Sequence, residues 1–421
     1  MRPIVGSVPS DVPTSVARVL DRAMADDPHR EALVTRHERL TYAALDRRAD
    51  QAAQALRALG VQPGDRVAAS LHNEAAVVVA FHGAMRLGAV WVGVNRVLAP
   101  PEKAFILDDC GASLLLGEED VPGTAVRAVL PDEWQAAVGA AEPHPVGRDV
   151  DPYAPAGIAY TSGTTGHPKG AVHSQWNLLV PGAALVASRG YGPALRKGDC
   201  FPFTILNMAV LTTLLVSQAG GCSIVMDRID AEGVAEWIRT ERVTTWNGPP
   251  VHTSSSDARS DGATVPAGAT GEIRVGPADD RYRPMLGYWE RPEATAEALV
   301  DGELCTGDLG AIDADGYLHV RDRKSLLIIR GGANVYPAEV ERVLLEAPGV
   351  VACAVVGVPD ERLGERIVAV VEGAPIDEGA LRAHCLAQLA RYKVPERFVA
   401  VDALPRNAMG KIVRTDLPSL L

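Results

Sequence analysis

The feature that most limits the possible folds is an alternation of helix and strand patterns near the start of the chain. Apolar residues recur at helical spacing from Leu45 to Leu59. Arg66 to Leu71 and Val90 to Val94 each predict a short apolar strand, and Asn73 is placed to cap a helix between them. Strand, helix and strand in this order predict an α/β fold wound around buried parallel strands.

The stretch from Tyr160 to Gly170, YTSGTTGHPKG, is rich in hydroxyl side chains and glycine. Such residues bury little apolar area, but hydroxyl groups and closely approaching backbone N–H groups are what a phosphate requires. Composition alone also fits a flexible surface linker. The stretch follows the apolar run Ala156 to Ala159, however, and a Gly-rich loop after a strand is a common anion site. We therefore predict an anion-binding loop.

Composition excludes several classes of protein. A chain of 421 residues predicts about two or three domains. The net charge of -12 argues against a protein that coats nucleic acid, so any anion must be bound at a local site. The six cysteines form no CxxC pair, which predicts neither a zinc site nor a disulfide framework and fits a reducing cytoplasm. The most apolar segment, Ile205 to Val216, is too short to span a membrane.

The second half of the chain has a different pattern. Residues 253–262, TSSSDARSDG, predict a linker or exposed loop. Short turn-bounded runs at Gly271 to Val275 and Leu318 to Arg321 then indicate a β-rich part. Pro337 begins a predicted helix that is followed by apolar strands such as Val350 to Val358. These patterns predict a separate α+β domain of about a hundred residues at the end of the chain.

Six motifs follow one another along the chain. They are YTSGTTGHPKG, Tyr288-Trp289 with Arg291 to Thr295, Thr306 to Gly310 (TGDLG), Asp322-Arg323-Lys324, Gly331 to Pro337 (GGANVYP) and Pro405 to Lys411 (PRNAMGK). Their order resembles that of the adenylate-forming superfamily, the acyl-CoA synthetases and their relatives. The resemblance implies an α/β fold in which a large adenylate-forming domain, residues 1–324, combines parallel sheets with a β-rich part, and a small α+β lid domain, residues 325–421, is mobile.

The resemblance also implies an activity and its site. Members of the superfamily use ATP and Mg²⁺ to convert a small carboxylic acid into an acyl-adenylate, and many then transfer the acyl group to coenzyme A. Lys411 matches the catalytic lysine, and no metal ligand is assigned. The implied cofactor-binding residues are Thr161, Ser162, Gly163, Thr164, Thr165, Gly166, Lys169, Asp308, Arg323 and Gly332. Without the resemblance, Asp308 would be taken for a turn residue, and Arg323 and Lys411 for surface charges.

The chain also departs from the pattern of the superfamily. A block that normally holds an adenine loop and a magnesium-binding glutamate is missing between Pro250 and Gly271. Three further positions differ from their usual residues, namely Ile205, Ser325 and Ala333. Two alternatives therefore stay open beside a CoA ligase: a ligase that loads the thiol of a carrier protein, and a homologue that binds CoA, an acyl thioester or a protein partner without forming adenylate.

Overall fold

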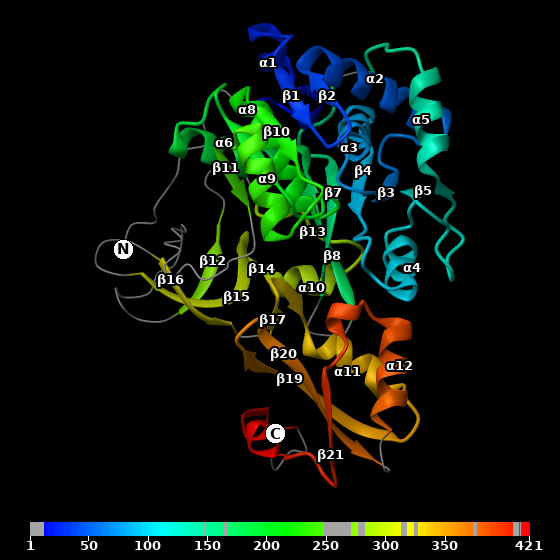
Figure 1. Cartoon of the computed structure of the whole chain (residues 1–421), viewed down its shortest axis with the longest axis vertical. Coiled ribbons are helices and arrows are strands. Elements are labelled where there is room, and N and C mark those ends of the chain that lie inside the picture. Colours follow the sequence, from blue (N-terminus) through cyan, green and yellow to red (C-terminus); the bar gives the residue numbers. More distant parts are fainter. Residues whose placement is uncertain are drawn as a thin grey trace.

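The computed structural model describes residues 12–146, 149–162, 167–247, 271–276, 283–312, 318–323, 327–373, 377–406, 412 and 414–421. Figure 1 shows two layered sheets with their helices in the upper part, a strand-rich part below them, and the elements after β16 at the bottom. Within the described residues, no helix is both long and apolar enough to cross a membrane.

A seven-stranded sheet forms the centre of the first part, in the order β13-β8-β7-β4-β3-β5-β6. Strands β7, β4, β3, β5 and β6 are parallel, and β8 and β13 add an antiparallel edge. The wound α/β prediction is therefore confirmed. The strands are β3 (Arg66–Ser70), β4 (Val90–Gly93), β5 (Leu114–Gly117), β6 (Ala128–Val129), β7 (Pro155–Ser162), β8 (Pro168–Ser174) and β13 (Gly287–Tyr288).

Helices cover this sheet because their apolar faces are buried against it and against each other. Helix α2 packs closely on α3, since a Cβ atom on Gly83 of α3 would lie 2.6 Å from the Ala52 Cβ atom of α2. The helices of this layer are α2 (Tyr42–Ala58), α3 (Ala75–Leu87), α4 (Pro100–Asp109) and α5 (Pro131–Ala140).

The predicted helix cap at Asn73 is wrong. Helix α3 begins after Glu74, whose side chain makes no capping hydrogen bond. The Asn73 amide donates to the Phe201 carbonyl at 2.8 Å and accepts from the Phe203 N–H at 2.8 Å. Asn73 therefore joins the start of α3 to the loop after β9, because a distant backbone offered it better partners than its own helix.

A second sheet has the order β11-β9-β10-β1-β2, of which only β2 is antiparallel to its neighbour. Its strands are β1 (Glu31–Val34), β2 (Arg39–Thr41), β9 (Arg196–Asp199), β10 (Cys222–Val225) and β11 (Thr245–Asn247). The helices in this part are η1 (Val16–Arg18), α1 (Asp21–Asp26), α6 (Gln175–Arg189), α7 (Leu206–Ala209), the π-helix η2 (Val210–Leu214), α8 (Leu215–Ala219) and α9 (Ala231–Glu241).

The predicted β-rich part is confirmed as an antiparallel sheet. It contains β12 (Gly271–Val275), β14 (Leu299–Val300), β15 (Glu303–Ile312) and β16 (Leu318–Arg323), and the short helix α10 (Pro292–Ala298) directly precedes β14. Strands β15 and β16 pair antiparallel, and residues 313–317 between them lie outside the described residues. The predicted loop at residues 253–262 also lies outside them.

The last part of the chain has its own sheet and its own buried apolar cluster. The strands are β17 (Ile328–Arg330), β18 (Ala333–Val335), β19 (Val350–Asp360), β20 (Gly364–Gly373) and β21 (Arg397–Val401). The helices are α11 (Pro337–Leu345), α12 (Glu378–Gln388), η3 (Arg391–Lys393) and η4 (Arg414–Leu420). This is the predicted α+β tail, and Figure 1 shows α11 and α12 below α4.

Candidate active site

The β7–β8 hairpin positions the stretch that was predicted to bind phosphate. Thr161 on β7 pairs with Lys169 on β8, and the Thr161 hydroxyl donates to the Lys169 carbonyl at 3.4 Å. Gly163, Thr164, Thr165 and Gly166 lie outside the described residues, as does the side chain of Ser162. The two strands therefore bring Thr161 and Lys169 to opposite sides of the predicted loop.

A partly buried network fixes β7 directly before that loop. Asp109, at the end of α4, accepts a hydrogen bond from the Tyr160 hydroxyl at 2.7 Å and one from the Arg291 guanidinium at 2.5 Å. Burial raises the pKa of Tyr160, and the hydrogen bond to Asp109 raises it further. Sequence reasoning missed Asp109. The sequence pattern that could have pointed to Asp109 is an acidic residue in the last turn of a helix, which is unfavourable beside the helix dipole unless the acid is paired.

Two motifs meet at Tyr288. The Lys169 ammonium lies 5.6 Å from the centre of the Tyr288 ring, within the range of a cation–π contact. Burial raises the pKa of Tyr288, and the nearby Tyr336 raises it further. Tyr336 follows β18 in the last part of the chain and Lys169 belongs to the first. Tyr336 of the GGANVYP segment is therefore near enough to act on the charge of Tyr288, whose ring contacts the predicted phosphate-binding lysine.

The TGDLG motif on β15 lies beside the first two residues of the DRK motif on β16. Asp308 is the cross-strand partner of Arg323, whose side chain lies outside the described set. Gly307 has φ +74°, a conformation that favours glycine. The Thr306 hydroxyl donates to the Ile273 carbonyl at 2.7 Å and accepts from the Asp308 N–H at 3.1 Å. These bonds set the backbone of Asp308, so the structure brings two predicted nucleotide-binding positions together.

The remaining predicted residues lie in the last part of the chain. Gly332 has φ +81° in the tight turn between β17 and β18, and its neighbour Gly331 donates from its N–H to the Leu363 carbonyl at 2.7 Å. Lys411 lies outside the described residues. Within the described residues, no group of three or more His, Cys, Asp or Glu side chains is arranged to hold a metal ion.

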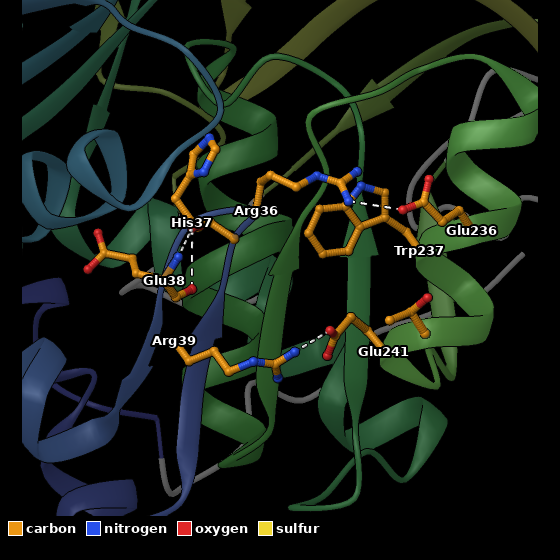
Figure 2. Close-up of a pocket in the computed structure, with 9 residues that line it drawn as sticks. Arg36, His37, Glu38, Arg39, Glu236, Trp237 and Glu241 are labelled. Carbon is orange, nitrogen blue, oxygen red and sulfur yellow. Dashed lines mark hydrogen bonds and ion pairs between the residues drawn. The ribbon is translucent and has the colours of Figure 1, made fainter.

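A cavity of about 400 Å³ lies in the second sheet's part of the molecule and contains none of the motif residues. Figure 2 shows Arg36, from the turn between β1 and β2, and Arg39, from β2, pointing toward Trp237 and Glu241 of α9. Arg36 lies 4.5 Å from the Trp237 ring centre and pairs with Asp227 at 2.9 Å, which lowers the pKa of Asp227 to about 2. Arg39 pairs with Glu241. The two arginines are already paired with acidic residues and link α9 to the sheet. The cavity therefore has little free charge with which to bind a ligand.

Two family models match the chain. The model of the AMP-binding enzymes matches residues 20–255, and that of the AMP-binding enzyme C-terminal domain matches residues 339–411. The first match ends in the segment that precedes β12, where the sequence predicts a missing block.

Curated relatives are similar over most of the chain. The long-chain-fatty-acid–CoA ligase FadD13 of Mycobacterium tuberculosis is 32% identical, over 90% of this chain and 92% of the relative. The feruloyl-CoA synthase of an Amycolatopsis species is 33% identical, over 93% and 96%. The alignment with the first relative has 473 positions, whereas 90% of 421 residues is about 379, so about 94 of its positions face no residue here.

Two solved structures of one protein differ in their likeness to this chain. The o-succinylbenzoate CoA synthetase MenE of Bacillus subtilis, as a double mutant bound with its product analogue OSB-NCoA, matches with a TM-score of 0.85 at 26% identity, covering 96% of this chain and 98% of that one. The same synthetase in complex with the acyl-adenylate intermediate OSB-AMP matches with a TM-score of 0.65 at 26% identity, covering 95% and 97%.

Proposed function

Because this chain belongs to the family of AMP-binding enzymes, we propose that it is an acid–thiol ligase that activates a carboxylic acid as an acyl-adenylate and transfers the acyl group to coenzyme A. The observation that carries the proposal is the contact of Lys169 with the Tyr288 ring, whose pKa is also raised by Tyr336 of the last part of the chain. This contact joins the predicted phosphate-binding strand to the Tyr288-Trp289 motif.

The first half-reaction needs charge neutralisation around ATP, because the carboxylate attacks a group that is already negative. We assign this role to the loop between β7 and β8, with Lys169 as a positive point charge at its end. Asp308 is the acceptor for the ribose hydroxyls, and Arg323 on the paired strand is a second contact for the nucleotide. Lys411 neutralises the charge that develops between the carboxylate and the α-phosphate. Mg²⁺ enters the proposal as the usual partner of a triphosphate.

The second half-reaction needs a narrow path for the thiol arm of the acceptor. Gly331 and Gly332 present backbone without side chains beside β18, which suits the close passage of a pantetheine arm. The higher likeness to MenE with a CoA product analogue than to MenE with an adenylate supports an arrangement of the two parts suited to transfer to CoA. The boundary between the parts is proposed at residues 324 and 325.

We further propose that the first half-reaction is impaired. The relative's unmatched positions, and the family match that ends at residue 255, support the loss of an internal block. In the family that block supplies an adenine wall and a magnesium-holding carboxylate, so its loss leaves the triphosphate poorly neutralised.

The test supplies the purified chain with ATP, Mg²⁺, CoA and a panel of fatty and aromatic acids, and detects acyl-CoA by mass spectrometry. A parallel reaction supplies synthetic acyl-adenylate with CoA, or with a carrier protein that bears a pantetheine thiol. Acyl-CoA from the adenylate supports the proposal even where ATP gives little product. Transfer to the carrier protein but not to CoA would mean that the acceptor is a carrier protein. No transfer to either thiol would overturn the ligase function.

A further inference from the structure

One lysine joins the two family-matched parts of the chain. The Lys393 ammonium in η3 lies 2.6 Å from Glu102 Oε1 of α4 and 2.7 Å from Glu339 Oε1 of α11. The side chains of Lys393 and Glu102 are each 8% exposed, and that of Glu339 is 4% exposed. We call these three residues the Lys393 clasp. Because Glu102 belongs to the first part and the other two to the last, the clasp exists only while α4 and η3 are in contact.

Glu102 holds both sides of this contact at once. Its Oε2 atom accepts from the Ala99 N–H at 2.8 Å, which closes the first turn of α4. The same oxygen accepts from the Ala390 N–H at 2.7 Å, directly before η3. The Glu102 carboxylate thus fixes both the first turn of α4 in the first part of the chain and the Ala390 amide in the last part.

The charges make the clasp sensitive to the loss of any member. Two carboxylates share one ammonium away from water, and burial raises the pKa of Glu339. Burial alone lowers the pKa of Lys393, but Glu339 and Glu102 outweigh it and hold that pKa above its ordinary value. Removal of one partner leaves an uncompensated buried charge, which is unfavourable until water reaches it. Separation of the two parts admits that water without unfolding either part.

We propose that the Lys393 clasp selects the arrangement of the two parts in which the acyl group is transferred to the thiol, so that Glu102, Glu339 and Lys393 are positioning residues for thioester formation. This inference rests on the proposed function. Its support is that the clasp contacts occur in an arrangement with a TM-score of 0.85 to the CoA-analogue complex of MenE and 0.65 to its adenylate complex.

The test compares Lys393→Met and Glu102→Gln with a matched control. Lys197→Met is that control, because Lys197 is also a buried lysine, 5% exposed, and its partner Asp199 at 2.6 Å lies on the same strand. The first readout is hydrogen–deuterium exchange of the peptide that contains Ala390, whose amide bonds to the other part of the chain. The second is the rate of thioester formation from supplied acyl-adenylate and CoA.

We expect exchange at Ala390 to rise, and thioester formation to fall, by at least about tenfold in both clasp variants. Lys197→Met should leave both readouts near the wild-type values, and Lys393→Arg, which keeps the charge, should recover much of the transfer rate. Unchanged protection at Ala390 in both clasp variants, or an equal loss in the control, would overturn the proposal. If the wild type forms no thioester, the proposed function fails, while the exchange experiment still decides whether the clasp holds the two parts together.

Discussion

A histidine inside the first part of the chain links stability to pH. His82 on α3 is buried, and its Nε2 atom lies 2.8 Å from the Thr213 hydroxyl in η2. Burial, together with the nearby positive charge of Arg86, lowers the pKa of His82 to about 3. The unfolded chain therefore binds a proton near pH 6.5 that the folded chain does not accept until about pH 3. Stability should fall as the pH drops through this window.

The variant His82→Gln should remove this dependence while keeping a polar group for Thr213. The wild type should lose about 1.4 kcal/mol of unfolding free energy per pH unit below pH 6.5 from this group alone, and the variant should not. Urea unfolding at pH 7 and pH 4.5 measures the difference, and exposed His37→Gln is the control. Parallel losses in the wild type and His82→Gln would contradict the prediction.

Lys411 should act in one half-reaction only. In Lys411→Ala, any adenylate formation that the chain retains should fall by a factor that corresponds to about 3–4 kcal/mol, since one focused charge is lost from the transition state. Thioester formation from a supplied acyl-adenylate should stay nearly intact. Pyrophosphate exchange and thioester assays on the same preparation separate the two steps. An equal loss in both would refute the assignment of separate roles to Lys411 and the GGANVYP segment.

The sequence predicted some candidate site residues and missed other structural partners for a physical reason. Thr161, Lys169, Asp308 and Gly332 stand in contiguous motifs, so a resemblance alone could predict them. Asp109 and Glu102 act through partners 182 and 291 positions away, on Arg291 and Lys393. Nothing in a local pattern specifies such a pairing, because the tertiary fold creates it.

At the level of elements, periodicity predicted most of the fold. The apolar run from Val350 to Val358 lies within β19, and the pattern that begins at Pro337 is α11. Buried strands and amphipathic helices bury their apolar residues at fixed spacing, so their positions can be read from one sequence. The cap at Asn73 could not be predicted, since two partners from a distant loop compete for its amide.

The β7–β8 hairpin should bind the terminal phosphates of ATP through its loop. Replacing Thr164, Thr165 and Gly166 together by alanine removes two hydroxyl groups and the backbone freedom of glycine, so ATP should bind more weakly. AMP lacks the β- and γ-phosphates and should be affected much less. Calorimetric titration of wild type and variant with each nucleotide decides this. Equal weakening for ATP and AMP would argue against contact between the loop and the terminal phosphates. If the wild type binds neither nucleotide, the loop has no phosphate-binding role in this chain.

At the scale of the whole molecule, the two sheets, the β-rich part and the α+β tail are retained although the chain is shorter than its relatives. A short connection can close a gap between strands at modest entropic cost if the flanking strands still pair. Strands β11 and β12, on either side of the segment outside the described residues, are each paired within a sheet. The fold should therefore persist without the missing block, whereas the chemistry that depended on the block should not.

The first measurement is the intact mass, because a value well above 44.5 kDa would mean that the block is present in the protein. At the mass of this sequence, we expect weak or absent ATP–pyrophosphate exchange with a panel of acids and Mg²⁺, because the proposed loss of the block would take a magnesium-holding carboxylate with it. A chain of this mass should nevertheless unfold cooperatively and convert supplied acyl-adenylate with CoA. Robust exchange at this mass would contradict the prediction, and another carboxylate, such as Glu272 or Asp308, would then have to lie near the metal.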